Sequence, residues 1–262
     1  MKILAIDTSG LVASVALVED DVLRAEFTTN DKKTHSQTLL PMLDQLRQMT
    51  SLELDTVDAI AIAAGPGSFT GLRIGSATAK GLGLALGKPL VEVPTLEGLA
   101  YNLYGSDRLV CPMMDARRNQ VYTGLYEFVP GERGGEDSAC VRNCPEDGGG
   151  PGMRFGLHVL RDQCAVDVKE IVEACNSLDR KVIFLGDGVP VYLEQIREYC
   201  KVPCCLAPAH LSRQRAASVA ALGAVYAAEG RLVSAKEHRP IYLRKSQAER
   251  EREEADGHHT GT

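Results

Sequence analysis

The residues best suited to chemistry are an aspartate and two hydroxyl side chains that follow the first apolar stretch of the chain. Asp7, Thr8 and Ser9 come directly after the apolar residues 3–6, and a returning apolar stretch begins near residue 13. A carboxylate, hydroxyls and backbone N–H groups at such a turn can bind a metal–phosphate group. The same residues can instead satisfy their own backbone in an Asx or Ser turn, so the spacing leaves both interpretations open.

A second aspartate stands at the matching place later in the chain. Asp115 follows the apolar residues 109–114, as Asp7 follows residues 3–6. Two carboxylates across a cleft, with a later Gly-Asp-Gly turn for a base or ribose, would suit a nucleotide. Arg117 and Arg118 can clamp phosphate, fill the cleft or face solvent. The residues of this predicted nucleotide or phosphate cleft are Asp7, Thr8, Ser9, Asp115, Gly186 and Gly188.

A glycine-rich turn, Gly-Pro-Gly-Ser-Phe-Thr-Gly at residues 65–71, joins a predicted strand to a predicted helix. Such a junction presents backbone N–H groups to an anion, although no lysine follows the last glycine as in a Walker A loop. Small residues then recur every four positions, which lets another backbone approach closely. That backbone is either the protein's own sheet or a partner's helix. The partner interpretation adds the leucine stripe of an earlier helix and predicts an interface of Leu39, Leu43, Leu46, Gly71, Gly75, Ala79, Leu82 and Gly83.

The histidines and cysteines show no spacing typical of a catalytic or metal site. His35, His158, His210 and His238 lack ligand spacing, and no Ser/His/Asp set can be assembled from the sequence. The eight cysteines contain no Cys-x-x-Cys pair, which is the usual zinc or redox signature. We therefore predict no catalytic residues, no metal site and reduced thiols in the cytosol.

The acidic charge is concentrated in two segments. The net charge of −6 divides into −3 at residues 131–152 and −3 at residues 249–262, so the rest of the 262-residue chain is formally neutral. A neutral body argues against an autonomous nucleic-acid binder. The sequence has no apolar run of about 18 residues and no signal peptide at its start. We therefore expect a cytoplasmic protein with no membrane partner.

Alternating strands and helices must position these residues. Apolar periodicity predicts strands at 2–6, 13–18, 22–28, 57–64, 90–93, 109–114, 120–128 and 181–185. It predicts helices at 36–49, 70–86, 168–175, 190–199 and 212–229. Two parts of the chain open alike, with a strand, an aspartate, a turn and a returning strand. We predict an α/β protein with halves at 1–104 and 105–248, a flexible glycine-rich insertion at 131–152 and a disordered tail at 249–262.

Several of these motifs resemble the TsaB family of bacterial proteins. They are Ile-Asp-Thr-Ser at 6–9, Ser-Val-Ala-Leu at 14–17, His-Ser-Gln at 35–37 before Leu-Leu-Pro, the glycine turn followed by Leu72 and Arg73, Asp-Ala-Arg-Arg at 115–118 with Val121 and Tyr122, and Tyr-Leu-Arg at 242–244. The resemblance runs from residue 1 to about residue 251, apart from the insertion. It implies an α/β fold of two RNase H-like halves from the actin and sugar-kinase ATPase superfamily.

The resemblance also implies a function in tRNA modification. The family belongs to the cytosolic machinery that forms N6-threonylcarbamoyladenosine beside the anticodon, in which a TsaD-like subunit transfers the threonylcarbamoyl group. The chain would bind and activate this transferase through its N-terminal helices, in a complex that includes a TsaE-like ATPase. The complex would use ATP, whereas this chain alone would bind no cofactor and no tRNA. A homodimer through the same helices stays an alternative.

One departure from the family's catalytic relatives bears on activity. Those relatives carry a His-x-x-x-His metal pair, and aligning Glu97 and Gly98 puts Thr95 and Leu99 at the two histidine positions. Leucine offers no lone pair, and a single threonine hydroxyl is a poor ligand for a transition metal. We therefore expect a non-catalytic partner subunit. Two other classes stay open: a metallopeptidase, and a nucleotide-dependent phosphotransferase that uses Asp7, Asp115 and residues 186–188.

Overall fold

The computed structural model describes residues 1–31, 34–130 and 155–244. Its strands form two mixed sheets of five strands each. The first sheet contains β1 (Lys2–Asp7), β2 (Ala13–Glu19), β3 (Val22–Thr29), β4 (Ala59–Gly65) and β5 (Leu90–Pro94). The second contains β6 (Leu109–Asp115), β7 (Gln120–Pro130), β8 (Phe155–Asp167), β9 (Val182–Leu185) and β10 (Cys204–Leu206). The predicted insertion at 131–152 and the predicted tail at 249–262 lie outside the described residues.

The helices connect and cover these strands. The α-helices are α1 (His35–Thr50), α2 (Phe69–Leu86), α3 (Thr95–Ala100), α4 (Val168–Ser177), α5 (Gly188–Val191), α6 (Leu193–Tyr199) and α7 (Ala216–Ala228), and two short 3-10 helices span Leu54–Thr56 and Tyr101–Leu103. Here the first lobe means β1–β5 with α1 and α2, and the second lobe means β6–β10 with α4–α6.

The two sheets have the same topology. The first has the order β3-β2-β1-β4-β5, and the second, taken from its other edge, has the order β8-β7-β6-β9-β10. In both, the first strand in sequence pairs antiparallel with the second and parallel with the fourth. This repeat confirms the prediction of an α/β protein built from two RNase H-like halves.

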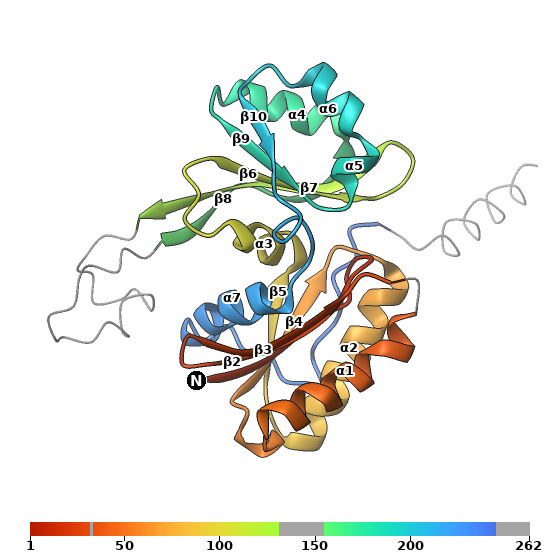
Figure 1. The fold of residues 1–262 in the computed structure, drawn as a ribbon, viewed down its shortest axis with the longest axis vertical. Coiled ribbons are helices and arrows are strands. Elements are labelled where there is room, and N and C mark those ends of the chain that lie inside the picture. The colour runs from red at the N-terminus through yellow and green to blue at the C-terminus, as the bar shows by residue number, and fades with distance from the viewer. Residues whose placement is uncertain (32–33, 131–154, 245–262) are drawn as a thin grey trace, which may run out of the picture.

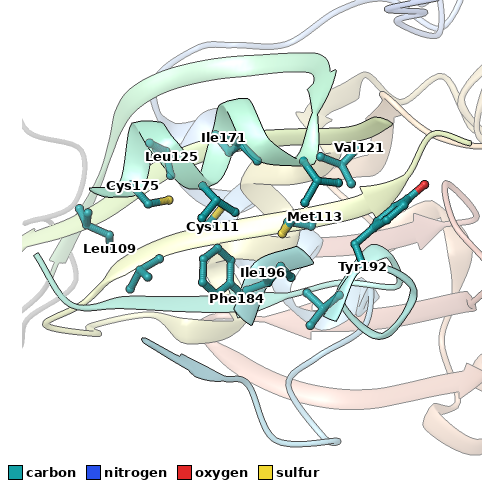
Figure 2. Close-up of a cluster of buried hydrophobic side chains, with 14 of the residues drawn as sticks. Leu109, Cys111, Met113, Val121, Leu125, Ile171, Cys175, Phe184, Tyr192 and Ile196 are labelled. Carbon is teal, nitrogen blue, oxygen red and sulfur yellow. The ribbon is translucent and has the colours of Figure 1, made fainter. Parts of the chain in front are cut away.

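Helices cover both faces of each sheet (Figure 1). On the outer face of the first sheet, Leu39 and Leu46 of α1 and Ala79 of α2 are buried against strand residues such as Leu4 and Ile62. On the outer face of the second sheet, α4 and α6 pack on β6, β7 and β9 around Cys111 and Phe184 (Figure 2). Burial of these apolar faces stabilises each lobe at about 25 cal/mol per Å².

Each lobe also receives a helix that belongs in sequence to the other part of the chain. Helix α3 follows β5 of the first sheet, yet its Leu96 and Leu99 are buried with residues of the second sheet. Helix α7 follows the second sheet, yet its Val219 and Ala220 pack on the inner face of the first. Both helices lie between the two sheets (Figure 1). The predicted boundary at 104/105 therefore separates the sheets but assigns α7 to the half on which it does not pack.

The observed elements differ from the predicted ones in several places, and helix α3 and strand β10 are among those that the sequence did not predict. Strand β8 was not predicted, and it pairs along β7 with shifts in register on either side of Leu125. The helix predicted at 190–199 is two short helices, α5 and α6, that meet at Tyr192. Helix α7 begins at Ala216 rather than near residue 212, because residues before it contact both lobes: Arg213 donates to the carbonyl of Gly186, and Arg215 pairs with Glu26.

Candidate functional site

The turn after β1 satisfies its own polar groups. Asp7 is 2% exposed, and its Oδ1 accepts hydrogen bonds from the backbone N–H of Ser9 at 2.9 Å and from its hydroxyl at 2.6 Å. Burial raises the pKa of Asp7 to about 6, and the two bonds from Ser9 oppose that rise. Of the two interpretations of this sequence, the structure therefore shows the Asx turn.

Neighbouring elements cover this turn. The hydroxyl of Thr8 donates to the carbonyl of Gly71 at 2.8 Å, and the backbone N–H of Ser68 donates to the carbonyl of Ser9 at 2.7 Å. His35 of α1 donates from Nε2 to the carbonyl of Gly10 at 2.9 Å. A metal–phosphate group could reach Asp7 only if these contacts opened.

The glycines of residues 65–71 allow this close cover. A methyl group added at Gly67 would overlap the carbonyl of Ser9, and one added at Gly71 would overlap the carbonyl of Thr8. Ser68 caps helix α2 by accepting a hydrogen bond from the N–H of Gly71 at 3.3 Å. The glycine motif therefore packs against the turn after β1, and the N–H groups of Ser68 and Gly71 are used within the chain.

The turn after β6 has a different construction. The Oδ1 atom of Asp115 accepts from the backbone N–H of Arg117 and from the hydroxyl of Tyr192, both at 2.8 Å, and Oδ2 lies 3.1 Å from Nη1 of Arg117. After the buried Ala116, residues Arg117, Arg118 and Asn119 have φ of 63°, 56° and 61° and are exposed. Left-handed backbone costs a residue with a side chain about 1–2 kcal/mol. The turn thus holds two arginines outward in a strained conformation.

The predicted base- or ribose-binding turn lies beside this second aspartate. Gly186, with φ of 109°, packs on the carbonyl of Met113, and Gly188 packs on the backbone that joins Met114 to Asp115. Burial raises the pKa of Asp187 between them. The structure therefore brings Asp115, Gly186 and Gly188 together in the second lobe, whereas Asp7, Thr8 and Ser9 are grouped with Gly71 in the first.

The predicted interface residues face into the first lobe. Ala79 is fully buried, a methyl group at Gly75 would overlap the Thr8 side chain, and one at Gly83 would meet Ala235. The leucines of the prediction, Leu39, Leu43, Leu46 and Leu82, belong to the cluster between the helices and the sheet. The small-residue groove is therefore filled by the protein's own chain, which corrects its assignment as a surface for a partner.

A second row of small residues lies on the outward side of α2. Ala77, Gly81 and Ala85 are spaced four residues apart and exposed, and nothing lies within 4 Å of a methyl group added at Gly81. Leu84 on α2 and Leu40 on α1 are 53% and 60% exposed. This outer helix face is available for contact with another molecule.

A Ser–His–Glu set was missed by sequence reasoning. Nε2 of His238 lies 2.9 Å from the hydroxyl of Ser76, and Nδ1 lies 2.5 Å from Oε1 of Glu92. The arrangement resembles a hydrolase triad, but Ser76 is 4% exposed and His238 is 1% exposed. The set therefore ties the C-terminal segment to α2 and β5. No local pattern could reveal it, because His238 lies more than a hundred residues after both partners.

Among the described residues, no three His, Cys, Asp or Glu side chains are grouped as metal ligands would be. Within that part of the chain, no helix is both long enough and apolar enough to span a bilayer. The six described cysteines are free thiols.

Comparison with known proteins shows the family. The family model described as "TsaD: tRNA N6-adenosine threonylcarbamoyltransferase" matches residues 22–252. The "tRNA threonylcarbamoyladenosine biosynthesis protein TsaB" of Bacillus subtilis is 33% identical over 223 residues, which cover 85% of this chain and 87% of that protein. The chain belongs to the TsaB family.

Other relatives agree with this assignment. TsaB of Escherichia coli is 38% identical over 130 residues, which cover 48% of this chain and 55% of that protein. The solved structure of YeaZ from Pseudomonas aeruginosa is 27% identical with a TM-score of 0.70, and the match covers 92% of this chain and 100% of the YeaZ chain. A second Pseudomonas aeruginosa structure, described as similar to peptidase YEAZ, is 28% identical with the same TM-score over 93% and 99% of the two chains.

In this member of the TsaB family, the two positions aligned with a histidine pair are used for packing. Thr95 is fully buried, and its hydroxyl accepts a hydrogen bond from the N–H of Gly65 at 3.1 Å. Leu99 is 1% exposed and lies in the cluster between α3 and the second sheet. Both side chains therefore hold the junction of the lobes together.

Proposed function

We propose that this chain is a non-catalytic subunit required for N6-threonylcarbamoyladenosine formation on tRNA beside the anticodon. It binds and activates a TsaD-like threonylcarbamoyltransferase. The observation that carries the proposal is the packing of Thr95 and Leu99 inside a chain that matches the transferase family model over residues 22–252. A hydrophobic leucine and a threonine hydroxyl already engaged by Gly65 leave no ligand pair for a transition metal.

The partner surface in this proposal is the outward face of α1 and α2. The inward row of small residues holds α2 close to the sheet, and the outward row presents a flat strip along Ala77, Gly81 and Ala85. Small residues at this spacing let a partner's helix approach closely, and Leu40 and Leu84 add exposed apolar area. A TsaD-like subunit is the proposed occupant, and a second copy of this chain is the alternative when the transferase is absent.

ATP enters the proposed complex through the other subunits, a TsaE-like ATPase among them. In this chain the carboxylate of Asp7 is covered and bonded to Ser9. That arrangement supports the absence of phosphate chemistry at this turn. No observation favours the phosphotransferase or metallopeptidase alternatives over the partner role.

The experiment is a binding measurement with interface variants. Gly81→Arg should leave the chain folded, because the position is open and helical, and should weaken binding to the transferase about tenfold or more by placing a desolvated charge in the contact. Isothermal titration calorimetry of the purified proteins measures the affinity of the transferase for the wild-type chain and for the Gly81→Arg variant. Ala79→Glu is unsuitable, because Ala79 is fully buried and a carboxylate there would disrupt the core.

Ser177→Arg is the matched control, since Ser177 ends α4 on the second lobe and is exposed. It should bind as the wild-type chain does. Equal affinity of the Gly81→Arg variant and the wild-type chain would remove α2 from the interface.

A further inference from the structure

Four arginines gather where the C-terminal segment crosses from the first lobe to the second. Arg244 donates from Nη1 to the carbonyl of Ala116 at 2.6 Å, which places it beside Arg117 and Arg118. Two residues earlier, the ring of Tyr242 lies 4.9 Å from the ring of Phe69 on α2. These contacts join the turn after β6 to the start of α2.

The guanidinium of the fourth arginine, Arg73, stacks on a ring of the same aromatic pair. The Cζ atom of Arg73 lies 3.9 Å above the centre of the Phe69 ring, so Phe69 is in contact with both Arg73 and Tyr242. Tyr242 is 40% exposed, and Arg73 is exposed. Stacking on an aromatic face orients a guanidinium while its N–H groups stay available for an anion. The arginine surface, defined here, consists of Arg73, Arg117, Arg118 and Arg244 with Phe69 and Tyr242.

Few carboxylates neutralise this surface. Asp115 pairs with Arg117, whose side chain is 85% exposed while that of Asp115 is 10% exposed. Within the described ranges, neither Arg73 nor Arg118 forms an ion pair with a carboxylate. The surface is therefore locally cationic, although the whole chain has a net charge of −6.

The strained backbone of the turn after β6 is a second observation that indicates binding at these arginines. Three consecutive residues with side chains, Arg117 to Asn119, adopt left-handed backbone. Such conformations persist where surrounding structure enforces them, and they are concentrated at binding sites. Here the enforcing contacts are the bonds from the N–H of Arg117 to Asp115 and from Arg244 to Ala116.

We propose that the arginine surface contacts the phosphate backbone of the tRNA that the partner transferase modifies. The identity of the RNA depends on the proposed function. Guanidinium forks bind phosphates and carboxylates alike, and RNA is favoured over an acidic protein because unpaired bases can also stack on the exposed ring of Tyr242. Arg73 also lies one helical turn before Ala77, so the surface borders the proposed partner face, and an RNA held by the partner can extend onto it. Because the remainder of the chain is formally neutral, this contact supports tRNA binding by the chain alone only at low salt.

The test is a salt titration of tRNA binding to the complex of this chain with the transferase, followed by fluorescence anisotropy. The Arg117→Gln/Arg118→Gln double variant should weaken binding roughly tenfold at low salt. It should also reduce the slope of log affinity against log salt by about 1.5, because two phosphate contacts are lost. Arg24→Gln/Arg197→Gln is the matched control; those side chains are 53% and 66% exposed and lie elsewhere. The control should keep the wild-type slope.

An unchanged slope in the Arg117→Gln/Arg118→Gln complex would overturn the proposal. So would a loss of transferase affinity in this variant with no change in slope, because that result would assign the arginines to an acidic protein surface. If the wild-type chain forms no complex with the transferase, the proposed function fails. In that case the same salt titration is carried out with the full chain alone at low salt. A smaller slope in the Arg117→Gln/Arg118→Gln variant than in the wild-type chain would support RNA contact by the arginine surface, and an equal slope would overturn it.

Discussion

The turns after β1 and β6 occupy the same place in two sheets of the same topology, yet they differ in almost every physical property. The first is buried, and its Asp7 is bonded within the turn to Ser9. The second is exposed and left-handed, and Asp115 is paired with an arginine of its own turn. Equivalent positions in two sheets of the same topology therefore do not imply equal chemistry, because the residues that follow each aspartate decide what covers it.

The physical reason is the size and charge of those following residues. Thr8 and Ser9 are small enough for Gly67 and Gly71 to pack directly on their backbone, with hydroxyls that bond locally. Arg117 and Arg118 are long and charged, so burial without partners would cost several kcal/mol and they stay in solvent. The first turn has become part of the core, and the second is a surface.

The largest expected effect is at the closed turn. Gly71→Ala should destabilise the protein by about 3 kcal/mol, because its methyl group would overlap the carbonyl of Thr8. Gly81→Ala, ten residues along the same helix, is the matched control and should stabilise by about 0.5–1 kcal/mol, since the position is open. Urea unfolding of both variants measures the difference. Equal stabilities would mean that the turn after β1 is not closed as described.

A somewhat smaller effect is expected from the buried carboxylate. The folded pKa of Asp7, about 6, is above the unfolded value near 3.8, so the carboxyl group favours folding below pH 3.8 and that contribution is lost as pH rises through 6. Asp7→Asn keeps the acceptor for Ser9 without the charge. It should be more stable than the wild-type chain by about 2 kcal/mol at pH 7, with the difference vanishing near pH 3.5.

Asp115→Asn provides the comparison for that prediction. Its carboxylate pairs with an arginine that is 85% exposed, so the variant should change stability by less than about 1 kcal/mol. Thermal unfolding across this pH range measures both variants. A pH dependence of Asp7→Asn that matches the wild-type protein would contradict the burial of a costly charge at the first turn.

Much of the fold could be predicted because its signals are local. The strand–aspartate–turn–strand openings of both halves, and helices such as α1 and α4, follow from apolar periodicity. Strand β8 was missed because it begins beside the glycine-rich segment and its pairing with β7 shifts register twice. The break at Tyr192 depends on a tertiary contact, the hydroxyl bond to Asp115.

The site was harder to predict than the fold. Helix α2 carries small residues on two sides, one through Gly75 and Ala79 and one through Ala77 and Gly81. Spacing cannot tell which side faces the sheet; the contacts with Thr8 and Ala235 decide it. The Ser76–His238–Glu92 set likewise joins three elements that only the fold brings together.

Reconstitution of the modification reaction tests the central claim most directly. N6-threonylcarbamoyladenosine would be measured by mass spectrometry on tRNA incubated with the transferase, its other partners and ATP, with and without this chain. A non-catalytic activating role predicts strong product formation only when the chain is present, and none from the chain without the transferase. Product formed by this chain alone, or transferase activity that is the same in its absence, would contradict the role of a non-catalytic activating subunit.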